Sequence, residues 1–141
     1  MGRGLLLVLA VVAASLTAAG CAKNETRVDV TYGDFVRDID VTRTIDVAPG
    51  TVFEVSLFSN PQSGFKWSEA EVSEAIVLSE RNREFVPLYG EQPHEKEPSG
   101  LDVFTFEALC KGQTRVRFLY SRPWDGGQQT VWTFTLVVRV S

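Results

Sequence analysis

The stretch Asn60-Pro61-Gln62-Ser63-Gly64-Phe65 lies between two segments that alternate apolar and polar residues, and it has the composition of a stiff turn. Asn60 precedes a proline and is therefore restricted toward extended backbone, while Pro61 fixes its own φ. Gly64 can adopt a positive φ or allow another backbone to approach closely. We therefore expect a constrained turn with a small neutral tip that could enter a narrow cleft. Taken alone, the same six residues could also form an ordinary turn between two strands of a hairpin.

On both sides of this turn, apolar and polar residues alternate with the two-residue period of β-strands, as at Phe53, Val55 and Leu57. The pattern recurs in short segments separated by turn residues, and no long amphipathic helix pattern appears. A brief helical turn is expected only within residues 69–75. The chain therefore predicts an all-β, immunoglobulin-like β-sandwich of about seven to eight antiparallel strands, formed by residues 26–141.

A second segment with turn chemistry, Tyr120-Ser121-Arg122-Pro123-Trp124, ends a strand pattern and precedes Asp125-Gly126-Gly127. A tryptophan just after a proline and before such a loop is expected at an exposed loop tip rather than in the core. Trp124 would then be a large, rigid apolar contact, and Pro123 would restrict the backbone that presents it. Arg122 would offer a planar set of donors to a partner or to a neighbouring loop.

Asn-Pro-x-x-Gly-Phe at residues 60–65, followed farther along the chain by Arg-Pro-Trp at 122–124, resembles the chagasin family of cysteine-protease inhibitors. The similarity extends over residues 44–140. The family has a third, glycine-rich loop between these two, and its counterpart here is Glu97-Pro98-Ser99-Gly100, of which only Gly100 matches well.

The resemblance implies an immunoglobulin-like sandwich in which three loops at one end cover the active-site cleft of a papain-like cysteine protease, with residues 61–64 over the catalytic cysteine and histidine. It implies protease-binding roles for a set of loop residues: Asn60, Pro61, Gln62, Ser63, Gly64, Phe65, Ser99, Gly100, Arg122, Pro123 and Trp124.

Residues 1–20 have the pattern of an export signal: Arg3 precedes a short apolar run, and small residues lead to Cys21. A glycine followed by cysteine at this point resembles a bacterial lipoprotein signal, in which Cys21 becomes the lipidated first residue. Ordinary cleavage that leaves Cys21 as a free thiol is the alternative. We expect residues 21–25 to be a tether, and the protein to be exported and lipid-anchored to the cell membrane or envelope.

The formal net charge of −4 is spread without a basic cluster, which argues against nucleic-acid binding and against a polybasic membrane patch. Any membrane contact is therefore expected to come from the lipid. The chain has two cysteines, Cys21 and Cys110, so no intramolecular disulfide is expected unless Cys21 stays unlipidated.

The sequence offers few candidate catalytic residues, so it gives little support to an enzyme. His94 is the only histidine and lies in a charged, proline-flanked loop. Cys110 shares an alternating face with Phe104 and Phe106, so we expect it in the core rather than as a nucleophile. The acidic residues of the same loop predict a solvated face rather than a calcium site: Glu91, Glu95 and Glu97.

We therefore expect a monomer without enzyme activity, cofactor or metal, whose partner is a papain-like cysteine protease. The alternative is a lipid-anchored β-sandwich that binds another protein or a glycan. A glycan module would ordinarily present several exposed aromatic residues on one face, whereas the one expected here is Trp124.

Overall fold

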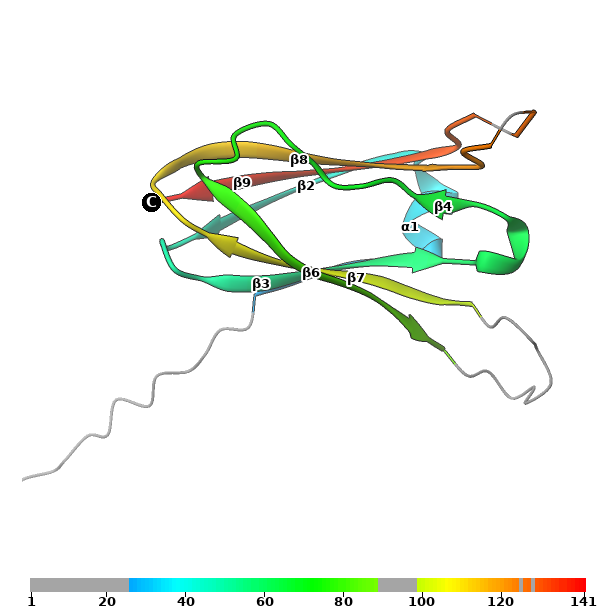
Figure 1. Cartoon of the computed structure of the whole chain (residues 1–141), viewed down its shortest axis with the longest axis horizontal. Coiled ribbons are helices and arrows are strands. Elements are labelled where there is room, and N and C mark those ends of the chain that lie inside the picture. Colours follow the sequence, from blue (N-terminus) through cyan, green and yellow to red (C-terminus); the bar gives the residue numbers. More distant parts are fainter. Residues whose placement is uncertain (1–25, 89–98, 125, 128) are drawn as a thin grey trace, which may run out of the picture.

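The computed structural model describes residues 26–88, 99–124, 126–127 and 129–141 (Figure 1). The predicted signal (1–20), the tether with Cys21, and the loop residues His94, Glu91, Glu95 and Glu97 lie outside the described residues. Strands dominate the described part, with one α-helix and one turn of 3-10 helix (η1). In chain order the elements are β1 (Arg27–Val30), α1 (Tyr32–Arg37), β2 (Asp40–Val47), β3 (Val52–Ser59), η1 (Pro61–Ser63), β4 (Lys66–Trp67), β5 (Glu71–Val72), β6 (Leu78–Pro87), β7 (Gly100–Ala108), β8 (Gly112–Ser121) and β9 (Trp132–Val140).

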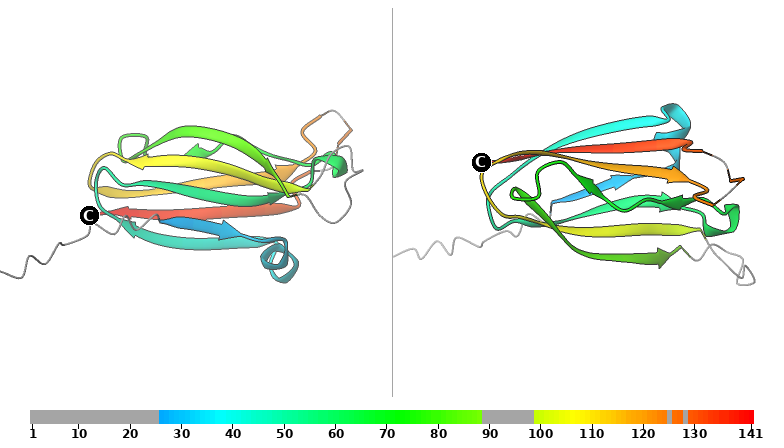
Figure 2. Two further views of the ribbon diagram at one scale, coloured as in Figure 1. Left: turned by 90° about the horizontal axis from the view of Figure 1, so that it is seen from below. Right: turned by 45° about the horizontal axis from the view of Figure 1, so that its top comes forward.

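The strands form two sheets packed face to face (Figures 1 and 2). One sheet has the strand order β1-β3-β7-β6, and the other has the order β2-β9-β8-β4, with β5 also pairing with β8. Alternate side chains of both sheets fill the space between them, and the five phenylalanines at its centre are almost fully buried: Phe53, Phe104, Phe106, Phe118 and Phe134. The predicted all-β, immunoglobulin-like sandwich is confirmed.

Two strand pairs differ from the antiparallel arrangement that we expected, because β1 pairs with β3 and β2 pairs with β9 in parallel. The reason is the path of the chain. After β1 it crosses to the other sheet through α1, returns along β2, and crosses back through the turn at Gly50 into β3. Strands β1 and β3 therefore run in the same direction in one sheet. The described part also contains nine strands rather than seven or eight.

The helix lies at Tyr32–Arg37 and not within residues 69–75, where the chain instead forms the short strand β5. Thr31 and Asp34 form a reciprocal capping box at the start of α1. Phe35 is buried and stacks on Trp132, with ring centroids 4.8 Å apart. A six-residue helix is unstable alone, and burying a phenylalanine contributes about 1.5–3 kcal/mol, so this packing holds α1 in place.

Cys110 is exposed, which corrects its predicted place in the core. Strand β7 ends at Ala108, and the chain turns before β8 begins at Gly112, so the alternation of faces stops two residues before the cysteine. Among the described residues, no helix is long and apolar enough to cross a membrane.

One end of the sandwich carries the loops with turn chemistry (Figures 1 and 2). Strand β3 runs into η1 there, and Ser59 at its last position pairs with Gly100 at the start of β7. Lys66, just after η1, pairs with Ser121 at the end of β8. Pairing thus places the turn at residues 60–65, the start of β7 and the end of β8 at the same end of the molecule.

Candidate functional site

Residues 60–65, here called the wedge, form a single tight turn after β3. One turn of 3-10 helix separates extended Asn60 from Gly64, whose φ of 80° lies in the left-handed region. The Ser63 N–H donates to the Asn60 carbonyl at 3.1 Å, and the Gly64 N–H donates to the Pro61 carbonyl at 3.0 Å. The Ser63 hydroxyl also donates to the Asn60 carbonyl at 2.6 Å. Together with the fixed φ of Pro61, these bonds leave the wedge few conformations.

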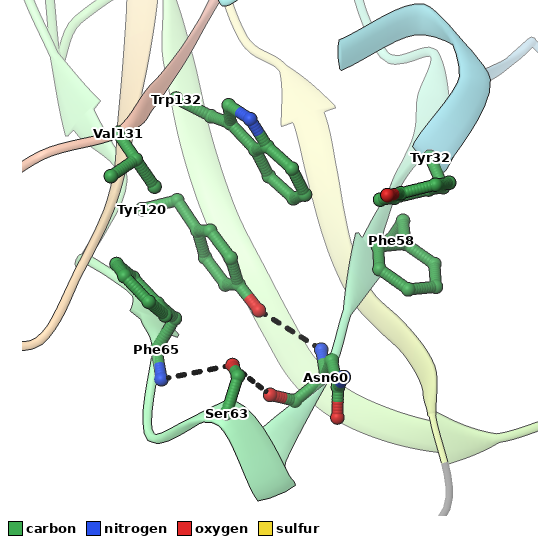
Figure 3. A pocket seen from close by; sticks show the side chains of 8 residues that line it. All are labelled: Tyr32, Phe58, Asn60, Ser63, Phe65, Tyr120, Val131 and Trp132. Carbon is green, nitrogen blue, oxygen red and sulfur yellow. Dashed lines mark hydrogen bonds between the residues drawn. The ribbon is translucent and has the colours of Figure 1, made fainter. Parts of the chain in front are cut away.

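Tyr120 of β8 fixes both ends of the wedge to the sandwich (Figure 3). Its hydroxyl oxygen accepts a hydrogen bond from the Asn60 N–H at 3.0 Å. Its ring stacks on Phe65, with centroids 5.3 Å apart. Tyr120 is itself buried, so the wedge rests on a side chain that the core holds in place.

Residues 122–124, here called the arm, follow β8 directly and contact the wedge. Arg122 donates from Nε to the Ser63 carbonyl at 3.0 Å, and its guanidinium carbon lies 4.6 Å from the centroid of the Phe65 ring. Of the two roles expected for Arg122, this geometry supports bracing of the neighbouring loop. A planar guanidinium can donate and stack at once, which an ammonium group cannot do.

Trp124 lies on the surface, half exposed, with one edge of its indole against Gly64. A Cβ added to Gly64 would lie 2.7 Å from Cη2 of Trp124, so the ring occupies the space that a side chain would need. The Gly127 N–H donates to the Trp124 carbonyl at 2.8 Å and closes the turn behind the tryptophan. The expected exposure of Trp124 is thus confirmed, and the indole extends the apolar surface of the wedge.

Ser99 and Gly100 belong to the same end of the sandwich but differ in environment. The Ser99 carbonyl accepts a hydrogen bond from the Leu88 N–H at 2.8 Å. Gly100 is buried as the first residue of β7, and a Cβ there would lie 2.4 Å from the ring of Phe85 and from the Val86 carbonyl. Close packing against β6 therefore explains why position 100 is a glycine.

Charge is sparse in the described site, because the wedge is neutral and the arm carries one cation, Arg122. Behind the wedge, Arg83 of β6 donates to the Trp67 and Ser68 carbonyls at 2.9 and 3.2 Å and lies near Asp102. Burial raises the pKa of the Asp102 carboxyl, against the opposing effects of Arg83 and of a hydrogen bond from Ser59. Within the described ranges, no group of three or more His, Cys, Asp or Glu side chains could hold a metal ion.

Sequence reasoning missed a groove between the wedge and α1 (Figure 3). Its volume is about 580 Å³, and aromatic side chains form most of its walls. The lining residues come from four separate segments: Tyr32, Phe58, Asn60, Ser63, Phe65, Tyr120, Val131 and Trp132. The one available sequence signal was the Thr31-x-x-Asp34 pattern of a capping box, which would have placed a helix start beside Tyr32.

The fold and the site together define a binding protein of immunoglobulin-like architecture that presents two joined loops as one rigid edge. Comparison with known proteins specifies the family. Residues 46–138 match the model of the family described as "Chagasin family peptidase inhibitor I42". That match covers more than half of the chain, and the protein belongs to the chagasin family of peptidase inhibitors.

The chain is also similar to individual proteins. It is 25% identical to Amoebiasin-2 of Entamoeba histolytica over 104 residues, which cover 68% of this chain and 77% of that protein. The crystal structure of the cysteine protease inhibitor EhICP2 from Entamoeba histolytica superposes with a TM-score of 0.58 at 20% identity, covering 82% of this chain and 95% of that one. PbICP-C, solved in complex with falcipain-2, gives a TM-score of 0.60 at 11% identity, covering 82% and 98%. At these identities, the two structures support the fold.

Proposed function

We propose that this protein is a reversible inhibitor of papain-like cysteine proteases, whose wedge enters the active-site cleft while the arm contacts its rim. Membership in the chagasin family supports the inhibitor class. The observation that carries the proposal is the direct joining of the two family motifs. Arg122 binds the Ser63 carbonyl, and the Trp124 indole lies against Gly64, so both motifs would meet a partner as one surface.

A wedge of this kind would inhibit by occupying the cleft rather than by reacting. The Asn60 and Pro61 carbonyls accept hydrogen bonds within the turn, which keeps this backbone compact instead of extended like a bound substrate. Because the wedge is already ordered by its own bonds and by Tyr120, fixing it in a cleft costs little conformational entropy. Trp124 then adds the large apolar contact that typically dominates binding energy.

The test uses residues 22–141, which include every described residue, in titrations against several papain-like proteases. We expect reversible inhibition with the inhibitor recovered uncleaved. Trp124→Ala should weaken inhibition about thirtyfold, since truncating an aromatic hot spot costs about 2 kcal/mol or more. Its melting curve should stay close to that of the wild type, because Trp124 lies half exposed at the surface. Full protease activity at stoichiometric inhibitor would refute the proposal.

We also propose that Cys21 carries lipid and that the protein acts as an exported, membrane-anchored monomer. The signal-like residues 1–20 support lipidation. The described start of the domain is compatible with inhibition from an anchor: β1 runs parallel to β3, which leads into the wedge, so Arg27 at the start of β1 lies at the end away from the wedge. A tether on that side would leave the inhibitory edge facing away from the bilayer.

Cell fractionation tests the anchor separately from inhibition. Cys21→Ser should move the full chain from the membrane fraction to the soluble fraction without changing its inhibition of protease in solution. Unchanged fractionation would contradict lipidation at Cys21.

A further inference from the structure

We propose that the groove between the wedge and α1 is a fourth contact, and that it binds one apolar side chain from the protease surface beside the active-site cleft. This inference rests on the proposed function, because it assumes that a protease covers the wedge. The helix that completes the groove, Tyr32–Arg37, lies outside the family-matched residues 46–138. Tyr32 is therefore a feature of this chain that the family motifs do not include.

The floor of the groove is a continuous row of aromatic rings that begins at the wedge (Figure 3). Phe65 stacks on Tyr120, and Tyr120 stacks on Trp132 with centroids 4.9 Å apart. Tyr32 stands on the far side, 5.2 Å from Phe58 and 6.0 Å from Trp132 between centroids. A protease surface seated on the wedge would thus meet the groove next, without a gap between the two.

Tyr32 is held in place although it is exposed. The capping box of Thr31 and Asp34 fixes the start of α1, and Arg43 of β2 forms an ion pair with Asp34 at 3.2 Å. Phe35 anchors the helix in the core between Trp132 and Trp67. Tyr32 remains 55% exposed, so the helix presents a fixed aromatic wall to a partner.

The chemistry of the lining selects an apolar occupant. Among the described residues that line the groove, none carries a charge. Two of its hydroxyl oxygens already form hydrogen bonds with the wedge backbone, because the Ser63 hydroxyl donates to the Asn60 carbonyl and the Tyr120 hydroxyl oxygen accepts from the Asn60 N–H. Pockets that hold small ligands have volumes of about 300–1,000 Å³, so a groove of about 580 Å³ has room for a whole aliphatic or aromatic side chain. Binding hot spots are enriched in tryptophan and tyrosine and lie in well-packed, desolvated pockets of an interface.

The test compares inhibition constants of four variants of residues 22–141 against proteases that the wild type inhibits. Tyr32→Ala removes one wall and should weaken inhibition about tenfold. Tyr32→Phe keeps the ring and should inhibit like the wild type. Val131→Phe should fill the groove from another wall and weaken inhibition by a similar factor. Val36→Ala is the matched control, since Val36 is 65% exposed on the same helix and does not line the groove.

Melting curves identify any variant that loses its fold, and the two groove variants alter different segments, so a failure of one leaves the other informative. If the wild type inhibits while Tyr32→Ala and Val131→Phe match Val36→Ala, the fourth contact is wrong and the proposed function stands. If the wild type inhibits no papain-like protease, the proposed function is wrong, and the fourth contact, which rests on it, is wrong as well.

The occupant is identified by replacing Tyr32 with the photoreactive residue p-benzoylphenylalanine and irradiating the inhibited complex. We expect a cross-link to an apolar surface residue of the protease beside its cleft. Cross-links only to the inhibitor itself, within one chain or to a second copy, would overturn the proposal.

Discussion

Gly64→Ala should disrupt inhibition by moving Trp124, not by removing any contact of the wedge. An alanine Cβ at this position would lie 2.7 Å from Cη2 of the indole, closer than a Cβ approaches a non-bonded carbon, and 3.3 Å from Cζ2, which is a tight contact. The obstructing atoms are the far end of a side chain with two rotatable bonds, so the ring can swing away. The expected result is a folded protein with a displaced tryptophan.

Gly64→Ala should change both the folding stability and the affinity for protease. Gly64 has a φ of 80°, and a left-handed alanine costs about 1–2 kcal/mol of folding stability. The effect on affinity is limited by what the tryptophan contributes, about 2 kcal/mol or thirtyfold. Gly50→Ala is a matched control for the loss of folding stability, because Gly50 has a φ of 84° and the added Cβ would meet nothing within 4 Å. Gly50→Ala should lose comparable stability and inhibit like the wild type.

The assay is an inhibition titration combined with denaturant unfolding for Gly64→Ala, Trp124→Ala, the double variant and Gly50→Ala. If displacement of the ring is the mechanism, Gly64→Ala should weaken inhibition less than about twofold further in the Trp124→Ala background. The effects of mutating two residues in contact are not additive, and here the tryptophan is already gone. Multiplicative losses in the double variant would refute this reasoning, as would a Gly64→Ala protein that inhibits as well as Gly50→Ala.

Three further predictions concern the supporting structure. Tyr120→Phe removes the oxygen that accepts from the Asn60 N–H at 3.0 Å, so the free energy of unfolding should fall by about 1–2 kcal/mol, measured in urea, with weaker inhibition as the wedge loosens. Asp102→Asn should raise the melting temperature most at pH 7 and progressively less toward pH 4. Burial raises the pKa of Asp102 in the folded protein above its unfolded value of about 3.9. Ionisation of Asp102 therefore costs stability as the pH rises from the unfolded pKa through the folded pKa, and the asparagine avoids this cost. Melting curves of the wild type and Asp102→Asn from pH 4 to pH 7 would contradict this if the gain in melting temperature grew on acidification. Cys110→Ala, at an exposed position, should change neither the melting temperature nor inhibition, and a clear loss of stability would show that the thiol packs against the protein.

The parts of the site that could be predicted from sequence are those whose conformation is set locally. Pro61 and Gly64 restrict backbone dihedrals wherever they stand, so a stiff turn followed from six residues alone. The exposure of Trp124 followed in the same way from the proline and glycines around it. Alternation of apolar residues likewise predicted two packed sheets, because burial of one face is a property of each strand separately.

The features that escaped prediction depend on distant parts of the chain. Alternation carries no strand direction, so it could not indicate that β1 pairs with β3, and β2 with β9, in parallel. The helix α1 is held by the contact of Phe35 with Trp132, far along the chain, and the groove exists only because four segments meet. Cys110 was misplaced because a periodic pattern does not mark where a strand ends.

The hydrogen bond from Arg122 to the Ser63 carbonyl has a consequence for redesign of this inhibitor. The wedge does not hold its position alone: it is braced by Tyr120 of β8 and by Arg122, which directly follows β8, in the sheet opposite β3. A scaffold that received only the six wedge residues would copy the sequence of the turn without Tyr120 and Arg122, the side chains that hold it in its orientation. Transplantation would have to carry the end of β8 and the arm as one unit with the wedge and β4, because β4 and β8 are paired neighbours.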